Sequence, residues 1–448
     1  MRYLPLTEEE RQEMLQSLGV DKIEDLFTAI PEEMRLRTDL DLPAPLSEAE
    51  LIRHFTELAN KNNDLKSSVS FLGAGSYDHL VPSVIKHLVG RGEFLTAYTP
   101  YQPEITQGVL QSIFEFQTLI CQLTGMEAAN ASMYDGASAL AEAALMACAA
   151  TRRELVVLPS SLHPEWQDVV RLYLENQDVS IAYLPYDENT GIVDPKAFDG
   201  ISWSEVACVV VQQPNFFGLL ENVASFKQIA EESGALLVMA VDPISLSLLK
   251  SPGELGADIV VGDGQSLGSA MGFGGPSLGF FATSSTKLIR RMPGRVVGET
   301  VDSEGTRGFV LTLQTREQHI RREKATSNIC SNQALNALIA AIYLSVMGKE
   351  GFRDVGYQSL QKANYMKGRL LEIDGLSSPF SAPSFREFVI QGAVDWDEVN
   401  MRLAEHGFVG GLPLARFGLP EMVLFSVTEA RTKEEIDSFV NLLRGLIS

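Results

Sequence analysis

The sequence predicts an α/β protein with a mainly parallel sheet that helices cover on both faces. Five short apolar runs, rich in β-branched residues, lie between residues 154 and 263, and stretches with helical periodicity separate them. Apolar strands that alternate with helices are typical of a parallel sheet buried on both sides. The chain has 448 residues, 45% of them hydrophobic, so it can build two or three domains around a large core.

Each strand and helix of this fold has its own segment. The strands are expected at 154–159, 179–185, 206–213, 234–242 and 258–263, with helices at 136–151, 164–177 and 222–233. We expect four parts in the chain: an N-terminal helical arm over 1–66, a large α/β domain over 67–310, linking helices over 311–350 and a small C-terminal α+β domain over 351–448.

The N-terminal arm carries two signals for the start of a helix. Thr7 is followed by Glu10 three residues later, and Ser47 by Glu50. This spacing is typical of a capping box, in which the hydroxyl and the carboxylate bond to free backbone amides of the first turn. A short helical segment of this kind rarely builds its own core, so we expect it to wrap a neighbouring domain or subunit.

The composition argues against several classes of protein. The formal net charge is −22 and the isoelectric point is about 4.7, so the surface repels the phosphates of nucleic acids. No apolar run approaches the roughly 18–20 residues that span a bilayer, and the acidic start has no signal-peptide pattern. The scattered cysteines predict free thiols, no metal site and a cytoplasmic protein; they are Cys121, Cys148, Cys208 and Cys330.

Three groups of residues fit an aromatic cofactor that carries a phosphate. Gly136, Ala137 and Ser138 open a helix with small side chains, so their backbone amides can face an anion. His163 follows a strand and offers a flat ring for stacking. Asp242 ends a buried strand, where parallel sheets bind ligands, and can pair with a protonated ring nitrogen. Each group alone also fits a structural role, as an ordinary helix start, a packed histidine or a turn aspartate.

The next turn resembles the lysine turn of pyridoxal-phosphate enzymes with the aminotransferase fold, fold type I. Those enzymes have a phosphate helix, a stacking residue, a carboxylate strand and then a lysine that binds the cofactor covalently. Here the turn reads Asp263-Gly264-Gln265-Ser266-Leu267, and Ser266 stands near the lysine position. Lys250 and Lys287 flank the segment and fit solvated surface positions. We therefore expect a vestigial pocket with no covalently bound cofactor.

Two long segments resemble one family of such enzymes. Residues 96–143 and 312–335 are similar to the corresponding stretches of the glycine cleavage system P-protein, the pyridoxal-phosphate glycine decarboxylase, and the similarity extends over essentially the whole chain. In this family the protein is either one long chain of two related halves or two separate subunits. The lysine-bearing half resembles NLHKT at its turn, so a chain with Ser266 there resembles the N-terminal half, subunit 1 of the two-subunit form.

The resemblance implies an activity and its partners. A lysine-bearing subunit 2 would carry the pyridoxal phosphate, and two copies of each subunit would form a heterotetramer. This assembly would decarboxylate glycine and pass the aminomethyl group to the lipoyl arm of H-protein. A loop of the present chain would contribute to the partner's active site, through Tyr98, Tyr101, Gln102, Glu104 and Gln107. The alternative for this loop is a structural proline turn with buried tyrosines.

Two other functions stay open from the sequence. A self-sufficient pyridoxal-phosphate enzyme, of the aminotransferase or cysteine-desulfurase type, needs Lys250 or Lys287 in the pocket. A non-catalytic homodimeric scaffold, descended from such enzymes, needs neither a lysine nor a second kind of subunit. The absorption spectrum of the isolated chain distinguishes the first from the others, and co-purification from the native source distinguishes the second.

Overall fold

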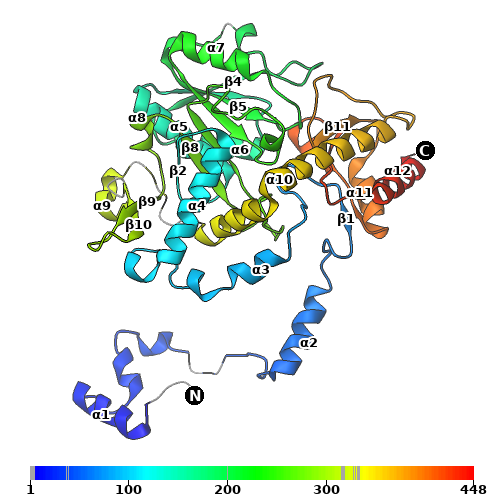
Figure 1. The fold of residues 1–448 in the computed structure, drawn as a ribbon. Helices are drawn as coiled ribbons and strands as arrows, with labels where there is room; N and C mark the ends of the chain where they lie inside the picture. Colours follow the sequence, from blue (N-terminus) through cyan, green and yellow to red (C-terminus); the bar gives the residue numbers. More distant parts are fainter. Residues whose placement is uncertain are drawn as a thin grey trace. The chain divides into compact units, whose positions relative to one another are not determined.

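The computed structural model describes residues 6–36, 38, 40–198, 200–313, 318–325, 327, 329 and 333–447. Contacts between residues divide the chain into two compact units, Met1–Asn63 and Asp64–Ser448. Figure 1 shows the second unit as layers of helices around a central sheet. None of the helices in the described part of the chain is both long and apolar enough to cross a membrane.

A seven-stranded sheet forms the centre of the unit Asp64–Ser448. The strands lie in the order β2-β8-β7-β6-β5-β3-β4, and the neighbours from β4 to β7 are all parallel, while β8 runs antiparallel to β7. The predicted α/β class with a mainly parallel sheet is confirmed. The bounds are β2 Ala128–Ala129, β3 Leu155–Pro159, β4 Ser180–Leu184, β5 Val206–Gln213, β6 Leu236–Val241, β7 Ile259–Asp263 and β8 Gly279–Thr283.

Helices cover the two faces of this sheet, and each face has its own core. Helices α5 (Gly136–Thr151) and α6 (Pro164–Leu174) pack on one face, where Val156 and Val210 point. Helices α4 (Gln107–Thr124), α7 (Val223–Ser233) and the start of α10 (Ala334–Leu370) pack on the other, where Val157 and Val209 point. Neighbouring residues of one strand thus enter different cores, because side chains alternate along a strand.

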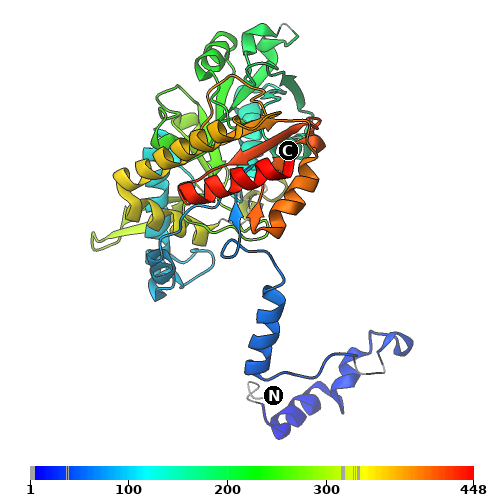
Figure 2. The same ribbon diagram turned by 90° about the vertical axis from the view of Figure 1, so that its right-hand side faces the viewer.

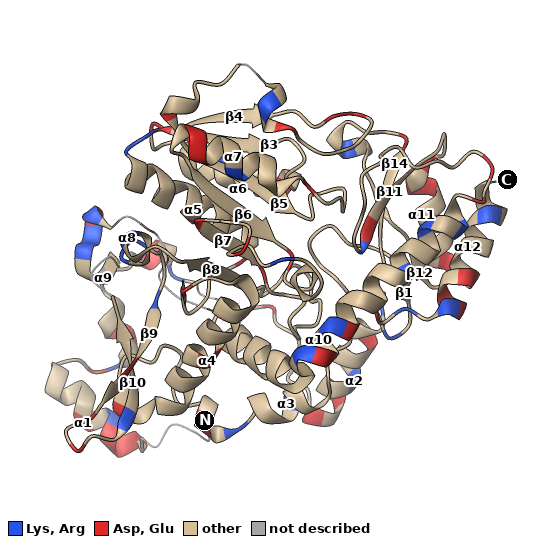
Figure 3. Cartoon of the chain, turned by 45° about the horizontal axis from the view of Figure 1, so that its top comes forward, with Lys and Arg blue, Asp and Glu red and all other residues tan. Residues whose placement is uncertain are grey.

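Charged residues are almost absent from the sheet, as the tan strands in Figure 3 show. Across β2 to β8 the sole charged side chain is that of Asp263, the last residue of β7. A charge at the end of a strand that is otherwise apolar and buried has to find partners within the protein. Asp263 is therefore the residue of the sheet that most needs polar partners.

The C-terminal elements form a smaller antiparallel sheet, β11-β14-β13, with helices packed against it. The long helix α10 (Ala334–Leu370) leads into them and is kinked at Gly348, which has a φ of 56°. Figure 2 shows α10 and α12 side by side on this part of the molecule. The other bounds are β11 Glu387–Gln391, α11 Trp396–Glu405, β12 Phe408–Val409, β13 Leu412–Pro413, β14 Met422–Ser426 and α12 Lys433–Ile447.

Two features differ from the segments expected for the linking region and the start of the large domain. Strands β9 (Val296–Val301) and β10 (Arg307–Thr312) form an antiparallel hairpin, so a strand rather than a helix occupies residues 311 and 312. Strand β1 (Val69–Ser70) pairs with β12, so these residues belong with the C-terminal elements. The boundaries between the four expected parts stay predictions. The remaining short helices are α3 Val84–Val89, α8 Thr286–Ile289 and α9 Gln318–Arg321.

The N-terminal unit contains the two helices that the sequence predicts. Helix α1 (Glu8–Leu18) begins with the Thr7/Glu10 capping box, and α2 (Glu48–Ala59) begins with the Ser47/Glu50 box. Both capping boxes are confirmed by reciprocal hydrogen bonds between side chain and backbone. None of the residues of α2 is buried in the described part of the chain.

Candidate functional site

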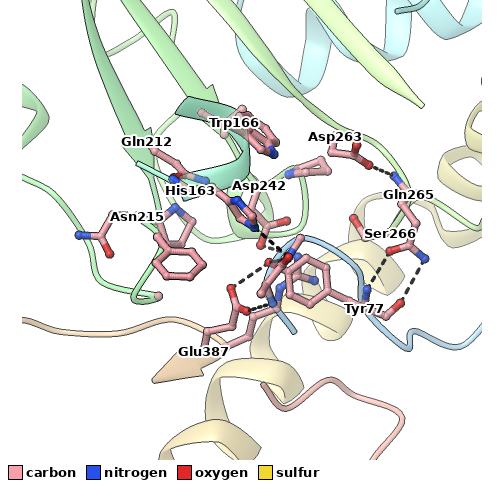
Figure 4. Close-up of a pocket in the computed structure, with 18 residues that line it drawn as sticks. Tyr77, His163, Trp166, Gln212, Asn215, Asp242, Asp263, Gln265, Ser266 and Glu387 are labelled. Atoms are coloured by element: carbon pink, nitrogen blue, oxygen red, sulfur yellow. Dashed lines mark hydrogen bonds and ion pairs between the residues drawn. The ribbon is translucent and has the colours of Figure 1, made fainter. Parts of the chain in front are cut away.

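A small pocket lies where the carboxyl ends of β5, β6 and β7 meet β11 and the segment 74–77 (Figure 4). Its cavity volume is about 50 Å³, far below the roughly 300–1,000 Å³ of pockets that hold small-molecule ligands. It is lined by Ala74, Gly75, Tyr77, His163, Trp166, Gln212, Pro214, Asn215, Phe216, Gly218, Val241, Asp242, Pro243, Asp263, Gln265, Ser266, Arg386 and Glu387.

The N-terminus of α5 points at this pocket, but its first amides already have acceptors. The carboxylate of Asp135 accepts the amide of Ser138 at 2.7 Å and caps the helix. The carboxylate of Asp263 accepts the amide of Gly136 at 3.1 Å. A Cβ on Gly136 would overlap the ring of Trp166, which covers the helix end. An external anion therefore finds two of these amides engaged and the approach blocked.

Asp263 is held by several donors at once. Besides the amide of Gly136, it accepts the amide of Gln265 at 2.9 Å, and the hydroxyl of Ser277 lies 2.8 Å from each carboxylate oxygen. Burial raises the pKa of Asp263 to about 6, although these hydrogen bonds favour the charged form. The negative charge lies at the positive end of the α5 dipole, where an anion is stabilised.

Asp242 is bound by an arginine from the C-terminal sheet. A nitrogen of Arg386 lies 2.9 Å from a carboxylate oxygen of Asp242, and both groups are largely shielded from water. The guanidinium also stacks on the ring of Tyr77, with its central carbon 3.5 Å from the ring centroid. The carboxylate of Asp242 therefore already has a planar cationic partner.

A buried polar network continues from this ion pair. The hydroxyl of Tyr77 donates to Glu387 at 2.8 Å, and the other oxygen of Glu387 accepts the amide of Ala74 at 2.7 Å. Arg386 also contacts His79, whose second ring nitrogen lies 2.6 Å from Glu429. Burial raises the pKa of Tyr77 and of Glu387, because water no longer stabilises their charged forms. The network joins groups that are about 310 positions apart in the chain.

His163 reaches the pocket but is engaged in structural contacts. Its Nδ1 accepts the amide of Glu165 at 3.2 Å and caps α6, so its Nε2 carries the proton and donates to the carbonyl of Ala74 at 3.0 Å. Burial lowers the pKa of His163, which keeps the ring neutral. The ring packs edge-on against Phe216.

The turn at the lysine position is bound to the segment around Tyr77. Ser266 is buried, and the neighbouring Gln265 accepts the amide of Tyr77 at 2.9 Å while donating to its carbonyl at 3.2 Å. No lysine is among the residues that line the pocket. Lys250 and Lys287 are exposed, and Lys287 donates to the carbonyl of Ala150 near the C-terminus of α5. The alternative of a self-sufficient enzyme with a displaced lysine therefore loses its structural basis.

The predicted site residues thus fall into three places. His163, Asp242 and Ser266 line the pocket, whereas Gly136, Ala137 and Ser138 lie buried behind it. The loop residues Tyr98, Tyr101, Gln102, Glu104 and Gln107 are exposed and do not line this pocket.

Two of these loop residues have contacts within the chain. The hydroxyl of Tyr101 accepts a hydrogen bond from Arg295 at 2.8 Å. The side-chain amide of Gln107 bonds to both backbone groups of Phe309 in β10, each at 2.9 Å. Tyr101 is thus held from one side while its ring stays exposed, and Gln107 fixes the hairpin.

Sequence reasoning missed the residues that close the pocket. Tyr77, Trp166 and Arg386 carry no signal in the periodicity of their segments. A signal did exist for one pair: Arg386 and Glu387 directly precede the apolar run Phe388–Ile390 of β11. Two adjacent opposite charges at the start of a core strand point to buried ionic contacts, since unpaired charges are costly there.

Comparison with known proteins shows the family of this chain. The family model described as glycine cleavage system P-protein matches residues 1–443. The chain belongs to the glycine cleavage system P-protein family. The resemblance that the sequence carries is thereby confirmed.

P-protein relatives match along the whole chain. A protein of Moorella thermoacetica named probable glycine dehydrogenase (decarboxylating) subunit 1 is 52% identical over 451 residues, with 100% of both chains covered. A protein of the same name from Geobacillus kaustophilus is 53% identical over 445 residues, which covers 99% of this chain and 98% of that protein.

Solved structures place the P-protein fold among related architectures. The crystal structure of a glycine decarboxylase (P-protein) in inhibitor-bound form superposes with a TM-score of 0.91, at 46% identity and with 100% of both chains covered. A sphingosine-1-phosphate lyase of Burkholderia pseudomallei, 16% identical, has a TM-score of 0.68 and 93% coverage of both chains, which shows a shared fold. The predicted aminotransferase-like fold is confirmed.

Proposed function

We propose that this chain is subunit 1 of a two-subunit glycine dehydrogenase (decarboxylating) of the glycine cleavage system. The observation that carries the proposal is the match along the full length to two proteins of that name, at 52% and 53% identity. The pocket supports it, since none of the residues lining it is a lysine. The assembled enzyme decarboxylates glycine and passes the aminomethyl group to the lipoyl arm of H-protein.

Pyridoxal phosphate is proposed to lie in a lysine-bearing partner, subunit 2, with two copies of each subunit in the assembly. When bound, this cofactor supplies a sink for the electron pair left when carbon dioxide departs. The pocket of the present chain does not fit it, because Asp263 occupies the helix N-terminus and Arg386 occupies the partner position at Asp242. The present chain is therefore proposed to form no covalent bond with the cofactor.

The contribution of this chain to the active site is proposed to come from the loop 98–107. Tyr98 is 79% exposed and Tyr101 is 53% exposed. Large aromatic side chains that protrude into solvent are typical of residues that become buried against a partner. The bond from Arg295 fixes the phenol of Tyr101, so this group is oriented before the partner arrives. The loop then excludes water from the partner's site and positions polar groups there.

The assembly is proposed to work in the cytoplasm. Cys121, Cys148 and Cys208 are free thiols in the structure, as expected for a reducing compartment; Cys330 lies outside the described residues. Burial raises the pKa of Cys121 and of Cys148 to about 11, so neither is a ready nucleophile at neutral pH.

Exchange of labelled carbon dioxide with the carboxyl group of glycine tests this function. The chain is purified alone and together with a candidate lysine-bearing subunit, and each preparation is assayed with lipoylated H-protein. We expect exchange from the pair and none above background from either chain alone. Exchange by this chain alone would instead favour the self-sufficient enzyme. A homodimer that recruits no second kind of subunit from its native source would favour the scaffold.

A further inference from the structure

We propose that Asp263 and Arg386 occupy the positions that the two charged groups of pyridoxal phosphate would take in this pocket. The pocket is then permanently closed by contacts within the chain, and it binds no cofactor. Asp263 replaces the phosphate and Arg386 replaces the protonated ring nitrogen. The inference goes beyond the proposed function, because it states what closes this pocket and what the closed pocket does. It does not depend on any turnover by the assembled enzyme.

At the position expected for the phosphate, the pocket already contains a negatively charged side chain. A helix N-terminus attracts an anion because its first amides are unpaired and its dipole is positive there. At α5 the anion is the carboxylate of Asp263, 3.1 Å from the amide of Gly136 and bonded to the hydroxyl of Ser277. The carboxylate is supplied by the chain itself, and its residue is half-buried. A phosphate would have to displace it and then lie beside a second negative charge.

The ring end is filled by a flat cation. In the expected cofactor site, Asp242 would face a protonated ring nitrogen. Here it faces the guanidinium of Arg386 at 2.9 Å, and this guanidinium stacks on the ring of Tyr77 at 3.5 Å. A guanidinium is planar and charged at all relevant pH values, so it meets the same electrostatic demand as the ring nitrogen. In Figure 4 the side chains of Tyr77 and Glu387 lie below Asp242 and Asp263.

The closed pocket joins three regions that are distant in sequence. Tyr77 bonds to Gln265 in the turn after β7 and to Glu387 in β11, and Arg386 connects β11 to Asp242 after β6. These contacts hold the central sheet, the segment 74–79 and the C-terminal sheet together. Removal of Arg386 would leave Asp242 buried without its charged partner, a state that strongly favours local opening.

The first experiment counts the cofactor. The full chain is purified with its partner subunit, and pyridoxal phosphate is titrated while native mass spectrometry reports the bound equivalents. We expect the wild-type complex to saturate at one equivalent per pair of unlike chains, even at millimolar cofactor. We expect the double variant Asp263→Ser, Arg386→Ala to bind a second equivalent that treatment with borohydride does not attach covalently to the chain. The proposal is overturned if the wild type binds two equivalents, or if the folded double variant stays at one.

The second experiment tests the internal contact and needs no cofactor binding. Hydrogen exchange of the complex is compared between wild type, Arg386→Met and the control Arg416→Met. Arg416 also combines an ion pair, to Glu165 at 3.3 Å, with stacking on an aromatic ring, but it is exposed. We expect Arg386→Met to speed amide exchange in residues 74–79 at least tenfold and the control to leave it within twofold. Equal effects of the two variants on amide exchange would overturn the proposal. If the double variant Asp263→Ser, Arg386→Ala does not fold, hydrogen exchange alone decides between the two outcomes.

Discussion

Asp263 provides the carboxylate that lies at the N-terminus of α5 in this pocket. It is the last residue of an apolar strand, it is half-buried, and it is bonded to the first amide of a helix and to the hydroxyl of Ser277. Burial opposes its charge, whereas the hydrogen bonds and the helix dipole favour it. The pKa of about 6 shows that burial has the larger effect.

This pKa predicts how stability depends on pH. The folded pKa of Asp263 is about 6, above the roughly 3.9 of an unfolded aspartate, so the native chain holds the proton more tightly. The stabilising contribution is complete below the unfolded pKa and is lost as pH rises through 6. Between about pH 5 and about pH 7.5 the free energy of unfolding should lose about 1.4 kcal/mol from this group. Urea unfolding at both pH values measures it.

The variant Asp263→Asn isolates the effect, since asparagine keeps the shape and does not titrate. The difference in unfolding free energy between wild type and variant should shift by about 1.4 kcal/mol across this pH interval. Asp258→Asn is the matched control, because Asp258 accepts the amide of Leu237 at the opposite end of the same strand segment. If the wild-type and Asp263→Asn curves stay parallel between the two pH values, the carboxyl of Asp263 does not titrate as described.

Ser266→Lys should not create an active enzyme. Ser266 is buried and shares a small cavity with Arg386, so a lysine there would meet a second positive charge in little space. We expect a lower melting temperature and no glycine-dependent exchange of carbon dioxide by the variant in the absence of subunit 2. Exchange above background by that variant would show that the missing lysine alone separates this pocket from an active one.

The loop 98–107 presents exposed polar side chains to solvent. Substitutions Tyr98→Phe, Tyr101→Phe and Glu104→Gln each remove one polar function and keep the shape. If the loop enters the partner's site, turnover per bound cofactor should fall roughly 10- to 1000-fold, as for other positioned hydrogen-bonding groups. Tyr357→Phe, at an exposed tyrosine of α10, is the control and should leave turnover unchanged. If all three substitutions change only the melting temperature, the loop is structural.

Helix α2 is the element with the clearest need for a partner. Leu51, Phe55 and Leu58 recur at helical spacing, and Phe55 is 59% exposed. Phe55→Glu should weaken assembly with subunit 2, measured by sedimentation of the co-purified chains. Arg53→Gln, on the opposite face, also makes the charge more negative by one and serves as the control. Equal sedimentation of both variants and wild type would exclude α2 from the interface.

Strands and helices could be predicted from sequence because each of their signals is local. The run VACVVVQQ at residues 206–213 became β5 with the same bounds, since a strand buried on both faces needs such a run. The hairpin of β9 and β10 was missed, because its residues are mostly exposed or half-buried and lack a clear apolar pattern. Long apolar elements are therefore easier to predict than exposed hairpins.

At the scale of the whole molecule, the contacts that close the pocket could not be predicted from local sequence signals. Of the residues proposed from the sequence, His163 and Asp242 line a pocket in the structure, whereas Gly136 does not. What fills the pocket depends on Tyr77 and Arg386, which lie in distant segments and meet only in the folded chain. A single sequence gives no periodic signal for such a contact, so the closure of the pocket could not be predicted.

The closed pocket has a consequence for how this subunit responds to vitamin B6 supply. A protein that binds a ligand only when folded gains stability in proportion to the logarithm of ligand concentration, so it weakens when the ligand is scarce. Asp263 and Arg386 are part of the chain, and their effective concentration never changes. The melting temperature of this subunit should therefore stay constant as pyridoxal phosphate is varied, while that of a cofactor-bearing partner should rise. We therefore expect this subunit to stay folded when pyridoxal phosphate is scarce, before its partner has bound the cofactor.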